Sequence, residues 1–150
     1  MTVSVRLAAA PFDPAAELAA CIAENPGAGG VVGFTGLVRP DEDVLALELE
    51  AYPGFTEAAI LAEASKVHGA HGLHAVRIVH RVGRIAVGEP VVFVAAAAAH
   101  RRAAFEGCDR TMDFLKSRAP FWKREHAAAG ARWIEPRAQD YDDAARWDAR

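Results

Sequence analysis

The stretch LHAVRIVHRVGRIAVGEPVVFVAAAAAH, residues 73–100, decides the fold of this chain. Its first part, LHAVRIVHRVG, is rich in the β-branched and aliphatic residues that are typical of strands, and PVVFVAAAAA has the same character. The residues Val87-Gly88-Glu89 between them are suited to a turn. We therefore predict two strands around this turn, and we expect strands joined so closely to pair antiparallel.

Further strand and helix patterns extend on both sides of this stretch. Val3, Val5 and Leu7 alternate with polar neighbours, and Asp13 is expected to cap the helix that follows it. The strand at residues 44–52 is expected to form a hairpin with the strand before it, and Thr56 to cap the next helix. The predicted strands cover residues 3–7, 29–39, 44–52, 73–83, 90–99, 121–127 and 131–136, and the predicted helices cover residues 14–24, 56–68 and 100–118.

The order of these elements predicts an α+β fold. Strands and helices do not alternate strictly, so a largely antiparallel sheet with about three helices packed on it is favoured over a doubly wound parallel fold. A length of 150 residues favours one domain over residues 1–150. The polar end of the chain, residues 138–150, is expected either to form a short helix or to fray.

Composition and charge exclude several classes of function. A formal net charge of -3 gives no support for nucleic-acid binding or for binding to an anionic membrane. The N-terminus lacks a signal pattern, and the longest apolar run, Val91–Ala99, has about half the length of a membrane span, so we expect a cytoplasmic protein. Cys21 and Cys108 lie far apart in apolar helical patterns and are expected to be buried rather than reactive.

Two patterns that suggest ligand sites have better explanations. GAGGVVGFTG, residues 27–36, resembles a dinucleotide fingerprint, but Val32 stands where the third glycine is needed and a strand follows instead of a helix. Its glycines are expected to allow a tight turn and close approach of neighbouring backbone. His68, His71 and His74 span a predicted helix end, so a solvated helix terminus is the better interpretation and we predict no metal site.

A group of cations stands where a strand is expected to pass into a helix. His100, Arg101 and Arg102 occupy this helix N-terminus, where positive charge is unfavourable unless an anion is bound. Free backbone N–H groups and arginine side chains at such a terminus favour a phosphate site. Arg39, at another strand end, could reach the same anion. A solvated basic turn explains the segment equally well, and a lone strand-end arginine is more often only exposed.

The segment FLKSRAPFWKRE, residues 114–125, places Lys116 and Lys123 on either side of Pro120. Lys116 lies in the last turn of a predicted helix, where its charge suits the helix dipole without any function. Pro120 prevents Lys123 from continuing the same helix face, and in a strand Lys123 shares its face with Glu125. Burial or neighbouring cations would lower a lysine pKa, as lysine chemistry requires. The residues alone leave a catalytic role and a surface role open.

Taken together, GFTGLVR, LELEAYPGFTEAA, AHRRAAF, LKSRAPFWKRE and RWIEPR resemble the large, catalytic subunits of molybdopterin synthase, the MoaE family. The likeness covers about residues 29–137, with the motifs in the same order. That family makes the dithiolene of the molybdenum cofactor by adding two sulfurs to cyclic pyranopterin monophosphate, or precursor Z. The resemblance implies an α/β hammerhead fold and sulfurtransferase activity, and we expect no bound cofactor.

The resemblance also implies roles for individual residues. Lys116 and Lys123 match the two active-site lysines, and Lys116 matches the one next to the terminal glycine of the partner. Arg39, His100 and Arg101 match residues that bind the anionic group of the substrate, the last two from the neighbouring protomer of a dimer. The remaining positions matched to the substrate site are Arg137, Phe34, Met112 and Glu125.

The partner implied by the resemblance is a small ubiquitin-like sulfur carrier that ends in Gly-Gly and bears the sulfur as a thiocarboxylate. A homodimer of this chain would carry one such subunit at each end of a heterotetramer. An external donor agrees with the lack of a reactive-cysteine motif here. The loop after Arg39, PDED at residues 40–43, is shorter than in many relatives and is expected to alter how the pocket closes.

Two competing hypotheses remain at this point. A non-catalytic module could dock a ubiquitin-like protein through the aromatic and basic residues FWKR, and would then not bind a pterin phosphate. An enzyme that acts on another phosphate ester or nucleotide could use the same cations without any protein partner.

Overall fold

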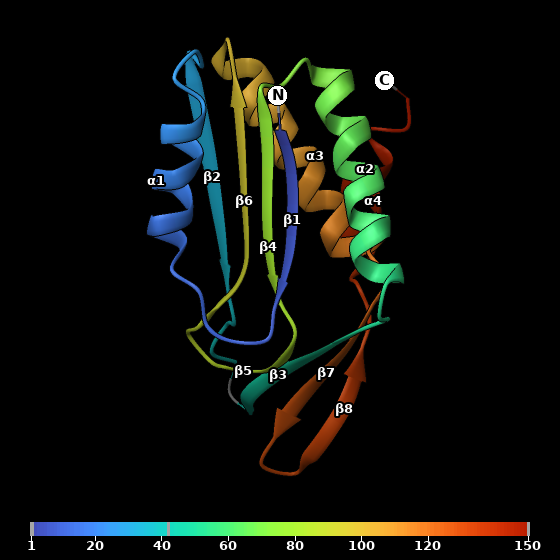
Figure 1. The fold of residues 1–150 in the computed structure, drawn as a ribbon. Helices are drawn as coiled ribbons and strands as arrows, with labels where there is room; N and C mark the ends of the chain where they lie inside the picture. Colours follow the sequence, from blue (N-terminus) through green and yellow to red (C-terminus); the bar gives the residue numbers. More distant parts are fainter. Residues whose placement is uncertain (1, 42, 150) are drawn as a thin grey trace.

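The computed structural model describes residues 2–41 and 43–149 of the chain. Within these residues it has two four-stranded sheets and four helices (Figure 1). The larger sheet has the order β1 (Thr2–Ala8), β4 (Ala75–Arg81), β6 (Pro90–Ala98), β2 (Gly30–Leu37). The smaller sheet has the order β5 (Gly83–Ala86), β3 (Val44–Ala51), β7 (Phe121–Ala127), β8 (Gly130–Ile134). The helices are α1 (Pro14–Glu24), α2 (Phe55–His71), α3 (Arg101–Ser117) and α4 (Ala138–Ala145).

Strands β4 and β6, which the opening stretch of sequence predicted, form the centre of the larger sheet. They pair antiparallel, with Ile78 opposite Val94, and β6 also pairs antiparallel with β2. Only β1 is parallel to its neighbour, β4, among the described strand pairs. The α+β class is therefore confirmed, although the strands divide into two sheets where one was expected.

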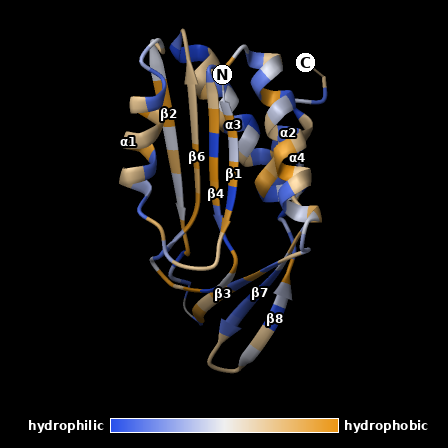
Figure 2. Cartoon of the chain, viewed as in Figure 1, coloured by the Kyte–Doolittle hydropathy of each residue, from blue (hydrophilic) through white to orange (hydrophobic). Residues whose placement is uncertain are grey.

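The larger sheet lies between helices on both faces (Figure 1). A hydrophobic core lies on each face of this sheet. Side chains of β6 pack alternately into one core and the other, because successive residues of a strand point to opposite faces. Val92 and Val94 pack with α2 and α3, whereas Phe93 and Ala95 pack towards α1. Figure 2 shows that β6 is hydrophobic along its length while β7 of the smaller sheet is hydrophilic. The larger sheet thus supplies the core, and the smaller sheet carries polar groups.

The predicted hairpin of β2 and β3 is wrong. β2 pairs with β6 in the larger sheet, and β3 pairs with β5 and β7 in the smaller one. The chain leaves the larger sheet after Leu37, and Val38 is buried beside Leu49 and Ile85 where the sheets meet. The alternating pattern of β3 was correct, but a pattern of alternation does not say which strand lies alongside.

Helix caps show one confirmed prediction and one error. The Asp13 side chain accepts a hydrogen bond from the backbone N–H of Ala15 at 2.9 Å and caps α1, as predicted. The N-cap of α2 is Gly54, with φ at 75°, and Thr56 already lies within the helix. The Thr56 hydroxyl contacts the chain elsewhere, at Tyr52 and Pro120.

The C-terminal segment forms α4, the helical one of the two alternatives predicted for it. Trp147, which follows this helix, is only 6 % exposed. Its indole N–H donates to the Asp113 side chain at 2.6 Å, and Arg146 forms an ion pair with the same carboxylate. These contacts attach the end of the chain to α3, the helix that carries Lys116.

Candidate active site

A cavity of about 420 Å³ lies where the two sheets meet. Its walls come from β2 and the loop after it, from β3, β4 and β6, from the C-terminal part of α3, and from β7 and β8. The cavity therefore requires both sheets to be in place. Six of the nine residues expected in the site line it: Phe34, Arg39, Met112, Lys116, Lys123 and Glu125.

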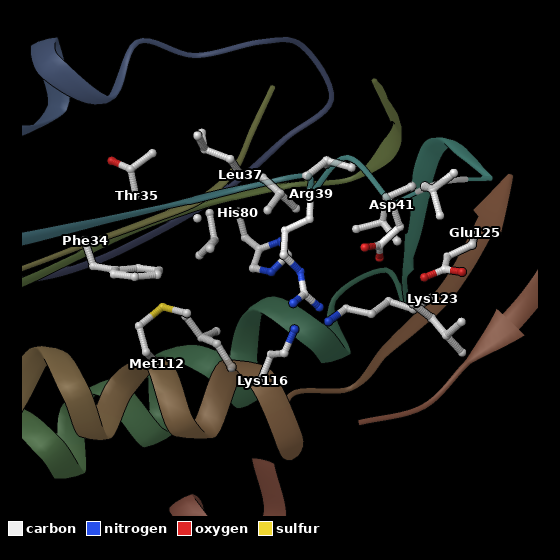
Figure 3. A pocket seen from close by; sticks show the side chains of 18 residues that line it. Phe34, Thr35, Leu37, Arg39, Asp41, His80, Met112, Lys116, Lys123 and Glu125 are labelled. Atoms are coloured by element: carbon white, nitrogen blue, oxygen red, sulfur yellow. The ribbon is translucent and has the colours of Figure 1, made fainter. Parts of the chain in front are cut away.

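Three cations converge in this cavity. Figure 3 shows the Arg39 guanidinium and the ammonium groups of Lys116 and Lys123 pointing toward one another from three separate elements. Among the described residues, no carboxylate lies within ion-pair distance of any of the three. Like charges held together without a counter-ion favour the binding of an anion.

The positions of the two lysines follow from the local structure between them. Helix α3 ends at Ser117, and its last carbonyls are satisfied when the N–H groups of Arg118 and Ala119 both donate to the Phe114 oxygen, at 2.8 and 2.9 Å. The chain turns at Pro120 and enters β7, where Lys123 pairs opposite Leu49 of β3. Leu49 is buried, so Lys123 points to the same interior face.

The neighbouring residues of β7 confirm this alternation. Trp122 is exposed on the other face, where its ring meets Trp133 edge-on at a centroid distance of 5.8 Å. Arg124 lies over the ring of Trp133 at 4.9 Å. Lys123 therefore points into the cavity while the residues on either side of it face away.

Burial lowers the pKa of Lys123 from 10.5 to about 8. Loss of solvation is the largest cause, the charge of Lys116 adds to it, and the carboxylate of Asp140 opposes it. Both causes named from the sequence, burial and a neighbouring cation, are therefore present, and burial is the larger. A lysine with this pKa remains mostly charged at pH 7 but can lose its proton at little cost.

Glu125 and two apolar residues complete the set that the structure brings together. Figure 3 shows Glu125 beside Lys123, with its carboxylate at the cavity wall. That carboxylate accepts two hydrogen bonds from Arg132, at 3.0 and 2.8 Å, and is thereby held in place. Phe34 and Met112 lie at the other end of the cavity (Figure 3), so a charged end faces an apolar one.

Comparison with known proteins decides which family has this arrangement. A family model described as "MoaE protein" matches residues 7–118. The molybdopterin synthase catalytic subunit of Caulobacter vibrioides is 56 % identical, over 96 % of this chain and 97 % of the relative. The chain belongs to the MoaE family. The corresponding subunit of Escherichia coli K12 is 44 % identical over 84 % of this chain and 86 % of the relative.

Solved structures of MoaE proteins have the same fold. The MoaE protein of Burkholderia ambifaria superimposes with a TM-score of 0.84 at 42 % identity, over 98 % of this chain and 99 % of that one. Molybdopterin synthase from Staphylococcus aureus gives a TM-score of 0.77 at 26 % identity, over 86 % and 95 % of the two chains. The α+β architecture with two sheets is therefore that of the family.

Membership of the MoaE family establishes the function at a coarse level. The chain acts in molybdenum cofactor biosynthesis as the catalytic subunit of molybdopterin synthase, a sulfurtransferase. A non-catalytic docking module and an enzyme of unrelated phosphate chemistry are thereby set aside.

None of the described helices has the length and hydropathy of a membrane span. In residues 2–41 and 43–149, no group of three or more histidine, cysteine or acidic side chains could hold a metal.

Three of the residues predicted for this MoaE site lie outside the cavity of the single chain. His100 and Arg101 stand at the N-terminus of α3, and Lys116 lies in its last turn. Arg101 and Lys116 are fifteen positions apart along the helix, or about 22 Å at 1.5 Å per residue. Arg137 is the exposed N-cap of α4 and does not line the cavity. One chain alone therefore does not bring His100 and Arg101 to the lysines, whereas Arg137 lies 3.8 Å from Asp140, the carboxylate whose charge acts on Lys123.

His80 is a residue of the cavity that the sequence reasoning missed. It is 4 % exposed on β4, and its ring stacks on Phe121 at a centroid distance of 4.3 Å. Its Nδ1 lies 2.9 Å from the Arg81 carbonyl oxygen, which can only accept, so Nδ1 carries the proton and Nε2 does not. Burial lowers the pKa of His80 to about 4, which keeps the ring neutral. A lone histidine in a strand of apolar residues was the available signal.

The loop after Arg39 is described only in part. Asp41 lines the cavity on the same side as Glu125 (Figure 3) and was also missed. The predicted effect of the short PDED segment involves Glu42, which lies outside the described residues.

Proposed function

We propose that this chain transfers sulfur from the C-terminal thiocarboxylate of a small ubiquitin-like subunit to cyclic pyranopterin monophosphate, with Lys116 and Lys123 as catalytic residues. The observation that carries the proposal is the convergence of Arg39, Lys116 and Lys123 in one cavity, without a carboxylate partner among the described residues. Both reactants are anionic at the groups concerned, one at its thiocarboxylate and one at its phosphate. Each would relieve the repulsion among the three cations.

The two lysines stabilise the oxyanion and move protons while the sulfur is transferred. Lys116 is exposed at the rim and receives the carrier's terminal glycine, whereas Lys123 is half-buried. The pKa of about 8 lets Lys123 act as acid and as base near neutral pH. Arg39 holds the phosphate through its planar guanidinium, and Glu125, which is held by Arg132, lines the site on the same strand as Lys123. Phe34 and Met112 contact the apolar part of the pterin.

The sulfur comes from outside the chain because neither cysteine is suited to carry it. Cys21 and Cys108 are both buried, with 1 % and 4 % of their surface exposed. Burial raises the pKa of Cys108 to about 12 and also raises that of Cys21, so both remain thiols at neutral pH. Since the thiolate is the reactive form, this supports an external thiocarboxylate donor.

The remaining cations reach the substrate through assembly. His100 and Arg101 are exposed at the start of α3, where free backbone N–H groups add to their attraction for phosphate. In the proposed homodimer they belong to the site of the neighbouring protomer, and Arg137 adds a further positive group near the pocket. One small subunit at each end completes a heterotetramer. A related structure from Helicobacter pylori is a complex of subunits 1 and 2 of molybdopterin-converting factor.

Reconstitution tests this proposal directly. The purified chain, a thiocarboxylated small partner ending in Gly-Gly, and precursor Z are combined, and dithiolene product is measured. We expect Lys116→Ala and Lys123→Ala to lower the rate by about a hundredfold or more, the usual contribution of a positioned proton-transfer group. Lys66 is the remaining lysine of the sequence and lies exposed on α2, so Lys66→Ala is the matched control.

The outcome against the proposal is clear. If both substituted proteins stay folded, bind the partner and form product at the parent rate, the lysines are not catalytic. A second measurement concerns the phosphate: Arg39→Ala is expected to weaken pterin-phosphate binding while leaving partner binding intact. A chain that binds the carrier but no pterin phosphate at all would contradict the assignment of this cavity.

A further inference from the structure

The separation of the two lysines depends on a short turn. Lys116 lies in the last turn of α3, Lys123 lies within β7, and the chain reverses between them at Pro120. Proline has no backbone N–H, so this residue cannot hold the turn through a donor of its own. The turn itself is closed by the Phe121 N–H, which donates to the Ala119 carbonyl oxygen at 2.9 Å, so the Pro120 carbonyl oxygen is open to a connection from outside the turn.

Thr56 provides that connection. Its hydroxyl donates to the Pro120 carbonyl oxygen at 2.8 Å and accepts from the backbone N–H of Tyr52 at 2.8 Å. The residue is fully buried, with 0 % of its surface exposed, and both ends of its hydroxyl are satisfied. One oxygen atom therefore joins the end of β3, the first turn of α2 and the turn before β7.

This connection acts on the strand that carries Lys123. Tyr52 directly follows β3, and β3 pairs with β7 through Ala51 opposite Phe121. The Phe121 ring is held from the other side, where it stacks on His80 of the larger sheet. Besides its pairing with β3 and the backbone hydrogen bond from Phe121 to Ala119, the beginning of β7 is held by the Thr56 hydrogen bond and by the His80 ring contact, from two different elements. Of these, the hydrogen bond is the directional contact and sets where the turn lies.

We propose that Thr56 is a positioning residue for the reaction: its hydroxyl fixes the turn at Pro120 and so sets the distance between Lys116 and Lys123. It touches neither reactant, and it acts through the placement of Lys123. This inference rests on the proposed function, because it assigns Thr56 a part in the chemistry of those two lysines. Catalytic groups displaced by about 1 Å can lose about a hundredfold in rate.

Substitutions at position 56 separate the hydroxyl from the packing. Thr56→Val keeps the shape and removes the hydrogen bonds, and the pair Thr56→Ser and Thr56→Ala differs only in the hydroxyl. We expect Thr56→Val and Thr56→Ala to lower kcat, measured with saturating precursor Z and thiocarboxylated partner, by about tenfold to a hundredfold. Thr56→Ser is expected to stay within about threefold of the parent. If Thr56→Val does not fold, the serine and alanine pair decides.

A matched control and a double-mutant cycle distinguish positioning from mere stability. Thr111 is also buried, and its hydroxyl donates at 2.8 Å to the Gly107 carbonyl within its own helix. Thr111→Val is therefore expected to change stability similarly and kcat hardly at all. In a Lys123→Ala background, adding Thr56→Val should cause no further loss, since the group it positions is already absent.

Two results would overturn the positioning role. The first is equal kcat for Thr56→Ser and Thr56→Ala. The second is a Thr56→Val loss that is as large in the Lys123→Ala background as in the parent. Full activity of Lys123→Ala itself would instead overturn the proposed function. The two failures are therefore separated by the same set of proteins.

Discussion

Lys123 holds its ammonium group inside the cavity wall, next to Lys116, where burial keeps its pKa at about 8. In the unfolded chain the pKa returns to about 10.5, so between pH 8 and 10.5 the unfolded state binds more protons than the folded state. The free energy of unfolding therefore rises with pH through this window because of Lys123. Below pH 8 Lys123 is charged in both the folded and the unfolded state, and the cost of burying its charge lowers the free energy of unfolding in full.

This pH dependence leads to a prediction about Lys123→Met, which keeps most of the length of the side chain and removes its charge. We expect the free energy of unfolding at pH 7 to increase by about 1 to 3 kcal/mol, because each pKa unit is worth about 1.4 kcal/mol, the pKa falls from 10.5 to about 8, and solvent screens part of the effect. Urea unfolding at pH 7 and at pH 9.5 measures it, and the gain should shrink at the higher pH. Lys66→Met is the control, and an unchanged gain at both pH values would contradict the prediction.

The sequence predicted the direction of the Lys123 side chain but not its environment. Alternation along FWKRE correctly placed Lys123 and Glu125 on one face. The burial that lowers the pKa depends on Leu49 and on the larger sheet, which are remote in sequence. His80 was missed for a similar reason. In a run of apolar residues its position looks like core, and only the cavity beyond it shows that it borders the site.

At the scale of elements, α4 and the residue after its C-cap fasten the chain end to α3. Trp147 is 6 % exposed and donates to Asp113, so Trp147→Ala leaves a cavity and removes one hydrogen bond from a carboxylate that Arg146 still pairs. We expect a loss of about 3 kcal/mol in the free energy of unfolding, measured by chemical denaturation. Trp133, which is 57 % exposed on β8, is the control, and its substitution by alanine should cost less than about 1 kcal/mol. Equal losses would argue against the packed tail.

At the same scale, local sequence patterns predicted the extent of each helix or strand better than they predicted which elements lie beside it. The extents of α1, β3 and β7 followed from caps and alternation, which are properties of a few adjacent residues. The β2–β3 hairpin failed because Val38 finds its buried partners at the junction between the sheets. Thr56 was assigned as a helix cap because threonine favours that position, but Gly54 takes the cap with a backbone angle that threonine adopts only with strain.

At the scale of the whole molecule, the proposed dimer makes a distinctive prediction. If His100 and Arg101 of one copy complete the site of the other, Lys123→Ala and Arg101→Ala proteins are defective in opposite parts of a shared site. Mixed dimers of the two would contain one site with all its groups intact. Random mixing then restores roughly a quarter of parent activity, since about half of the dimers are mixed and each has one good site.

The measurement is dithiolene formation after the two variants are co-purified with different affinity tags. Each variant alone, at the same total concentration, is the control. Activity that stays at the level of the separate variants would show that the α3 N-terminus does not contribute across a dimer. The sequence implied this dimer only through the family resemblance. Within one chain, the two ends of the 17-residue α3 lie too far apart to share one pocket.

The smaller sheet joins parts of the chain that are far apart in sequence. Glu48 of β3 accepts a hydrogen bond from Arg124 of β7, its neighbour in space but 76 residues away along the chain. Contacts between residues so far apart in sequence form late and slowly in folding, because closing a long loop costs conformational entropy before the contact contributes any stability. The cavity, bounded by that sheet, is then among the last features to appear. A nascent or partly folded chain would accordingly lack this cavity, and with it the site proposed for the transfer.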